Sequence, residues 1–153
     1  MRTRFDIPNG LLSAGVSISG DGFGLPRVTV QDDFTLSGLP AGTPIMLVAH
    51  LGVSISANRL GYPRGAATMS DAFGHSVSAF LPGETELTVD VPAVAGQPFL
   101  LRFEVSAQGD YEGGGSASGA ISFSNVPPGA VVRSCNGYTT AGTVAVRRAI
   151  GHA

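Results

Sequence analysis

The sequence contains no lysine and no tryptophan, has a single cysteine, and is poor in charged residues, which make up 13% of the chain. Without lysine, a phosphate-binding loop of the Gly-Lys type is impossible. One cysteine, Cys135, excludes a disulfide within the chain and leaves the redox compartment open. The arginines form no dense stripe and the net charge is −2, so nucleic acid is not an expected partner.

Long apolar runs are also absent. No segment approaches the ~20 apolar residues of a membrane span, and the start "MRTRFDIPNGLL" lacks the apolar run of a signal peptide. We therefore expect no membrane insertion and no signal peptide in this sequence. With 22 glycines and 10 prolines there is little room for long helices. The length of 153 residues predicts a single domain over 1–153 with a substantial core.

What the chain has in quantity is alternation of apolar and polar residues. In "PIMLVAHLGVSIS" the apolar series Ile45 to Ile55 recurs at every second position, and the intervening residues turn from apolar to small and polar. The same pattern recurs in "ETELTVDVP" and "QPFLLRFEVSA". It predicts half-buried strands with one wet face. Weaker strand candidates cover 14–19, 27–31, 34–36, 76–80, 117–123, 130–134 and 143–148.

Turn signals separate these segments, among them "GLPAGTP", "GYPRG", "AVAGQP" and "NVPPG". Their spacing is typical of antiparallel β-sandwiches. The sequence therefore predicts an all-β fold, an antiparallel β-sandwich of the jelly-roll or immunoglobulin-like type with about eight to ten strands.

Several phrases resemble a known group of proteins. "DDFTLSGLPAGTP", "LTVDVPAVAGQPFLLRFEVSA", "GGGSASGAISFSN" and "PPGAVVRSCNGY" are similar to the Gly/Ala/Ser-rich exported β-domains of Gram-negative bacteria that often carry a PEP-CTERM sorting tail. The resemblance covers about 33–138, and the sorting tail itself is absent after Gly137. It implies a secreted or cell-surface protein, either structural or part of a matrix.

The stretch "GDYEGGGSASG" follows one predicted strand and precedes another, which predicts a hairpin tip. A second interpretation is a calcium loop, because Asp110 and Glu112 supply hard oxygen ligands and glycine lets backbone carbonyls turn inward. Two carboxylates are too few for tight binding. Asp32 and Asp33 complete such a site only if the fold brings them close, so we expect no cofactor beyond weakly bound calcium.

Catalytic signatures are missing. The histidines His50, His75 and His152 lack metal-ligand spacing, and the neighbours of Cys135 do not activate a thiol, so the sequence predicts a protein that is not an enzyme. Sugar binding is a more serious alternative, because β-sandwiches often bind glycans through exposed aromatic rings. Without tryptophan, the candidate rings are Tyr62, Tyr111 and Tyr138, all in turn-like stretches.

Strands rich in small residues, such as "GSASGAIS", present a flat face that another chain can approach closely. Our leading hypothesis is therefore a non-enzymatic extracellular structural protein that acts through self-association, as a homo-oligomer, or through contacts with a surface polysaccharide. The alternative is a carbohydrate-binding β-sandwich module.

Overall fold

The computed structural model describes residues 2–17, 23–57, 65–110 and 113–140. All regular secondary structure in these ranges is β-strand. The described residues therefore contain no helix that could cross a membrane. The strands are β1 (Arg2–Asp6), β2 (Leu11–Ser17), β3 (Phe23–Gly24), β4 (Arg27–Ser37), β5 (Pro44–Ala57), β6 (Gly65–Asp71), β7 (Ser76–Ala79), β8 (Gly83–Val94), β9 (Pro98–Ala107), β10 (Gly109–Asp110), β11 (Gly114–Ser124) and β12 (Val131–Ser134).

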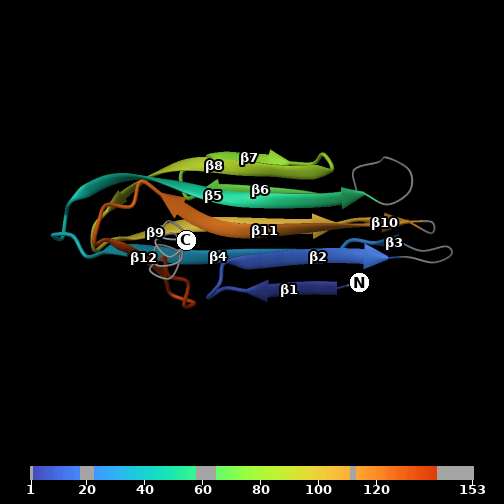
Figure 1. Ribbon diagram of the computed structural model, residues 1–153, viewed down its shortest axis with the longest axis horizontal. Helices are drawn as coiled ribbons and strands as arrows, with labels where there is room; N and C mark the ends of the chain where they lie inside the picture. Colours follow the sequence, from blue (N-terminus) through green and yellow to red (C-terminus); the bar gives the residue numbers. More distant parts are fainter. Residues whose placement is uncertain (1, 18–22, 58–64, 111–112, 141–153) are drawn as a thin grey trace, which may run out of the picture.

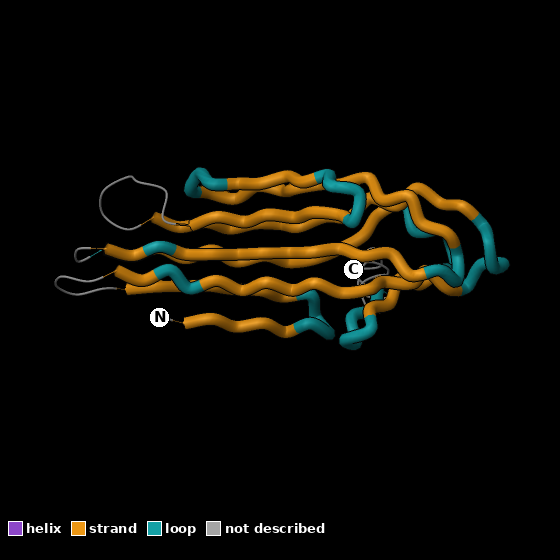
Figure 2. Tube along the Cα trace, turned by 180° about the vertical axis from the view of Figure 1, so that it is seen from behind, coloured by secondary structure: helices purple, strands orange, loops and turns teal. Residues whose placement is uncertain are grey.

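Ten of these strands form two five-stranded antiparallel sheets. The front sheet has the order β1-β2-β11-β5-β8 and faces the viewer in Figure 1. The back sheet has the order β12-β4-β9-β6-β7 and faces the viewer in Figure 2. The short strands β3 and β10 pair with each other at one end of the molecule. The predicted antiparallel β-sandwich is confirmed.

The connections identify the type of sandwich. After β2, the chain crosses between the sheets at almost every long connection, and only β6 and β7 follow one another within a sheet. Without the edge strands β1 and β12, the front sheet reads β2-β11-β5-β8 and the back sheet β4-β9-β6-β7. Eight strands in this order form a jelly roll, so of the two predicted types the structure has the first.

The core lies between the sheets and is built by the predicted alternation. In β5, Leu47, Ala49 and Leu51 are fully buried while the intervening residues face outward. The same holds for Leu101, Phe103 and Val105 in β9, which face the front sheet from the other side. Burial of each of these leucine, phenylalanine and valine side chains stabilises the fold by roughly 1.5–3 kcal/mol.

An aromatic cluster fills the end of the core near β12. The rings of Phe34, Phe99, Phe123 and Tyr138 lie 5.4 to 6.3 Å apart in contacting pairs. Tyr138 is 5% exposed, and its hydroxyl donates a hydrogen bond to the Ile121 carbonyl at 3.3 Å. Burial raises the pKa of Tyr138 to about 12.

Several sequence expectations need correction. The segments 27–31 and 34–36 belong to one continuous strand, β4, and the strands β1 and β6 were not predicted. The predicted hairpin at "GDYEGGGSASG" is wrong, because β9 pairs with β4 and β6 while β11 pairs with β2 and β5 in the other sheet. The segment therefore crosses from one sheet to the other. The candidate strand 143–148 lies outside the described residues.

Candidate binding face

The outer side of the front sheet carries a row of short hydroxyl side chains. In the ladder, Ser118 of β11 lies opposite Ser13 of β2 on one side and Ser54 of β5 on the other. The neighbours of Ser13 in β2, Leu12 and Ala14, are buried, so Ser13 and the residues paired with it face outward. Three adjacent strands thus present serine at the same height.

The row ends in opposite charges on the two edge strands. Ser13 pairs with Arg4 of β1, and Ser54 pairs with Glu84 of β8. The two charged residues stand four strand spacings apart, roughly 19 Å. Among the described residues, neither has an ion-pair partner in the chain. We call three rows of this surface the bare face: Arg4, Ser13, Ser118, Ser54 and Glu84; Asp6, Leu11, Ala120, Gly52 and Glu86; and, on the other side of the serine row, Gly15, Ser116 and Ser56.

The bare face is hollowed. An open depression of about 610 Å³ is lined by residues of all five strands of the front sheet, from Arg4 to Glu84. Its floor consists of glycine, alanine and serine, and Leu11 at its margin is 47% exposed. Among the residues that the structure describes, none with an aromatic side chain lines the depression. The surface offers hydroxyls and charges, with little side-chain volume above the backbone.

The fold does not require glycine at two positions of this surface, Gly52 and Gly15. A Cβ at Gly52 would meet only the Ala120 carbonyl oxygen at 3.8 Å, and one at Gly15 would meet the Ser116 Cβ at 3.7 Å, both ordinary contacts. Neither glycine has a positive φ among the described residues. Since strands favour β-branched and aromatic residues over glycine, local structure would gain from a larger side chain at both positions.

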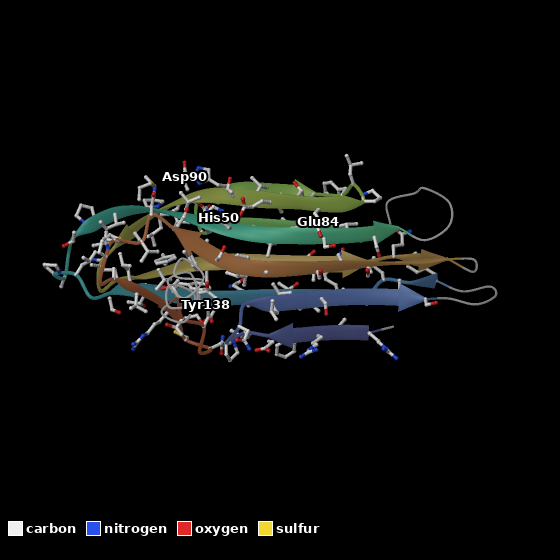
Figure 3. The ribbon with its side chains drawn as sticks, in the orientation of Figure 1. His50, Glu84, Asp90 and Tyr138 are labelled. Atoms are coloured by element: carbon white, nitrogen blue, oxygen red, sulfur yellow. The ribbon has the colours of Figure 1, made fainter. Side chains whose placement is uncertain are left out.

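At the margin of the bare face, three polar side chains join three strands. The Nε2 atom of His50 lies 2.6 Å from the Ser124 Oγ atom, and its Nδ1 atom lies 3.0 Å from Glu86 Oε1. His50 and Glu84, labelled in Figure 3, lie at separate places along the same sheet. The sequence identified His50 and Glu86 as wet-face residues of two strands, but their contact depends on a register that only the structure gives.

The order Ser124, His50, Glu86 is that of a nucleophilic triad. Acyl-transfer chemistry also requires donors for the developing oxyanion. Ser124 is the last residue of β11 and lies opposite Val48 of β5. Through these side-chain contacts the trio ties β11, β5 and β8 together.

Of the predicted calcium ligands, Asp32 and Asp33 do not converge. Asp32 and Asp33 are consecutive in β4 and point to opposite faces: Asp32 is buried and accepts a hydrogen bond from the Asn136 amide at 3.1 Å, whereas Asp33 is exposed. The backbone of Asp110 pairs with Phe23, and nearby Gly24 precedes Asp32 by eight residues, on the order of 25 Å along the chain. Glu112 lies outside the described residues. The described residues contain no metal-ligand cluster.

Of the three tyrosines predicted as candidate sugar-binding rings, the structure describes only Tyr138. Tyr138 packs in the aromatic cluster of the core, so the expectation of an exposed ring there is wrong. Its burial follows from Gly137 at φ 98°, where the chain turns back after β12 and the Tyr138 amide donates to the Ser134 Oγ atom at 3.1 Å. Tyr62 and Tyr111 lie outside the described residues.

A second depression, of about 680 Å³, lies at the end of the sandwich near the β6–β7 turn and is lined by Met46, Phe73 and Phe99 among others. The turn is held by Asp71, whose side chain is 3% exposed and accepts hydrogen bonds from the Phe73 and His75 amides, each at 2.9 Å. Burial alone would raise the pKa of Asp71, but the hydrogen bonds from His75 and Phe73 outweigh it and lower the pKa below its usual value.

No family model matches the chain, and neither does any curated protein. Among solved structures, it is similar to the carbohydrate-binding module TmCBM61 in complex with β-1,4-galactotriose, with a TM-score of 0.37 and 15% identity over 68% of this chain and 65% of that one. It is also similar to a structure of infectious bursal disease virus, Gx strain, with a TM-score of 0.29 and 13% identity over 80% of this chain and 38% of that one. The chain thus spans less than two thirds of either protein. Likenesses this remote carry no argument about ligand or assembly.

Proposed function

We propose that this is a non-enzymatic structural protein that acts by contact, with the bare face as its principal contact surface. The observation that carries the proposal is the room above Gly52 and Gly15, where the fold would accept a larger side chain and the sequence has none. A surface that carries small residues where the fold would accept larger ones suits a partner that approaches the sheet closely over a wide area.

The partners that fit such a surface are flat or extended. The front sheet offers hydroxyl groups in a regular array, from Ser13 across Ser118 to Ser54, with a charge at each edge. A second copy of the chain or an extended surface polymer meets this geometry. The resemblance of the sequence to exported Gly/Ala/Ser-rich β-domains supports an extracellular setting for these contacts.

A polysaccharide is the second candidate, and the depression in the bare face is the observation that favours it. Its size, its serine hydroxyls, and the side chains of Arg4 and Glu84 suit hydrogen bonding to sugar hydroxyls. Against it stands the lack of an aromatic ring among the lining residues, because stacking on such rings supplies much of the affinity in many sugar sites.

Two measurements separate these candidates. Sedimentation analysis across micromolar to millimolar concentrations measures self-association, and a glycan array followed by calorimetry measures sugar binding. We expect reversible self-association. A chain that stays monomeric over the whole range and binds no glycan would overturn the proposal of a contact protein.

A further inference from the structure

The bare face is complementary to itself. Its central row reads Arg4, Ser13, Ser118, Ser54, Glu84 from edge to edge of the front sheet, with β11 in the middle. A rotation of 180° about an axis parallel to β11 in the plane of contact exchanges the two edges. The same row then faces its own reverse, so arginine meets glutamate at both ends and serine meets serine between them.

We propose that a second copy of this chain binds the bare face in this two-fold arrangement, front sheet against front sheet. This inference rests on the proposed function and names its partner and geometry. The contact is isologous, because each copy contributes the same patch. Arg4 of each copy pairs with Glu84 of the other, and Ser118 lies on the axis.

The second row supports the same axis by shape. In this row, Leu11 of β2, which is 47% exposed, lies at the same distance from β11 as Gly52 of β5 on the other side. After the rotation, the Leu11 side chain of one copy stands over Gly52 of the other, where no Cβ occupies the space. A protruding residue thus meets a gap in the partner, at two equivalent places.

Within the central row, the charges favour this axis over one perpendicular to the strands. An axis perpendicular to the strands would place β1 against β1 and bring the arginines of two copies together, and like charges across an interface are unfavourable. This axis also places Asp6, which pairs with Leu11 at the edge of the second row, opposite Glu86 of the other copy, at two equivalent places. Each of these carboxylates already has a partner in its own chain: Asp6 accepts from Asn9 at 2.9 Å, and Glu86 lies 3.0 Å from His50.

The size of the face sets the strength of the contact. Five strands across and three rows along, at two residues per row, give roughly 24 by 20 Å, on the order of 500 Å² per copy. This is below the ~800 Å² per partner of a standard stable interface, so the dimer is weak and reversible. Charge pairs at its rim should make it sensitive to salt.

The test uses two charge-reversal variants, Arg4→Glu and Glu84→Arg, and their mixture. Alone, each variant places like charges at both ends of the row, so its dimer dissociation constant should rise at least about tenfold over the wild type. In a mixture, the new carboxylate at position 4 meets the new guanidinium at position 84, and the unchanged Glu84 of the first variant meets Arg4 of the second. A heterodimer should form about as well as the wild-type dimer.

Matched controls carry the same charge changes on the back sheet: Arg133→Glu in β12 and Asp33→Arg in β4, both at exposed positions. These should associate like the wild type, and circular dichroism checks that every variant is folded. If the wild type associates but the front-sheet variants behave like the controls, or their mixture does not recover association, the two-fold arrangement is wrong while self-association stands. If the wild type does not associate at all, both fail.

Discussion

The two faces of the front sheet use glycine for opposite reasons. On the inner face, a Cβ at Gly119 would lie 2.7 Å from Leu51 Cδ1 and 3.4 Å from Val105 Cγ1, so a side chain there would force Leu51 to shift within the packed core. On the outer face, a Cβ at Gly52 meets nothing closer than 3.8 Å. The inner glycine is explained by folding, whereas the outer one requires an explanation outside the fold.

The outer face of the back sheet sharpens this contrast. There, long polar side chains cover the strands and satisfy one another: Glu104 lies 3.3 Å from Arg27 and 3.0 Å from Arg102, and Thr29 donates to it at 3.2 Å. The back sheet keeps its charges together, while the front sheet places them at opposite edges with small residues between. A surface adapted only to water would have no need for that separation.

The largest effect on stability should come from filling the inner face. Gly119→Val places a branched side chain against Leu51, which is fully buried and would have to shift within the core. We expect a loss of about 2–3 kcal/mol in the free energy of unfolding, measured by urea denaturation. A loss below about 0.5 kcal/mol would mean that the core around β11 is looser than the structure shows.

The next effect concerns the aromatic end of the core at high pH. The pKa of Tyr138 is about 12 in the folded chain, above the ordinary value near 10, so the folded state favours the neutral phenol. Its contribution is complete below pH 10 and is lost as the pH rises toward 12. Because the chain has no lysine, few other side chains titrate in this range.

Tyr138→Phe isolates this contribution. At neutral pH it removes the 3.3 Å hydrogen bond to Ile121 and should cost about 1 kcal/mol. The variant should also lose less stability than the wild type between pH 10 and 12. Equal alkaline losses in thermal melts of the two proteins would show that Tyr138 is not the group responsible.

A smaller effect is expected at the β6–β7 turn. The pKa of Asp71 is lowered, so its stabilising contribution is present above the ordinary pKa and is lost as the pH falls through the folded value. Asp71→Asn keeps an oxygen for the Phe73 and His75 amides but removes the negative charge beside the His75 ring. We expect a loss of less than about 1 kcal/mol near neutral pH, and no difference from the wild type in strong acid.

The sequence predicted the fold well because alternation survives wherever one strand face is buried. The series through Leu47, Leu87 and Leu101 predicted three long strands, and they correspond to β5, β8 and β9 of the structure. The strand β1 escaped prediction because its residues are almost all exposed at the edge of the sheet, so they show no apolar period. In β6, Gly65 and Ala66 dilute the pattern.

The candidate site was less accessible to sequence reasoning. The small residues of 116–120 indicated a flat face, but the row from Arg4 to Glu84 joins residues that are 80 positions apart through four registers, and a register is invisible in one strand alone. For the same reason, Asp32 and Asp33 looked like a ligand pair although consecutive strand residues point to opposite faces.

The smallest effect on stability is expected at Gly52, the glycine of the outer face. Its substitution also tests most directly whether the glycines of the two faces have different roles. Gly52→Val adds a β-branched side chain to a central strand where the space is free, so the free energy of unfolding should stay within about 0.5 kcal/mol of the wild type or rise. The same change fills the gap that receives Leu11 of a second copy, so self-association in sedimentation experiments should weaken at least about tenfold.

A back-sheet substitution at an exposed position, Thr29→Val, serves as the control and should leave association unchanged. If Gly52→Val destabilises the chain as Gly119→Val does, the outer glycine is a requirement of the fold after all. The lack of a side chain at position 52 would then give no indication of a binding partner.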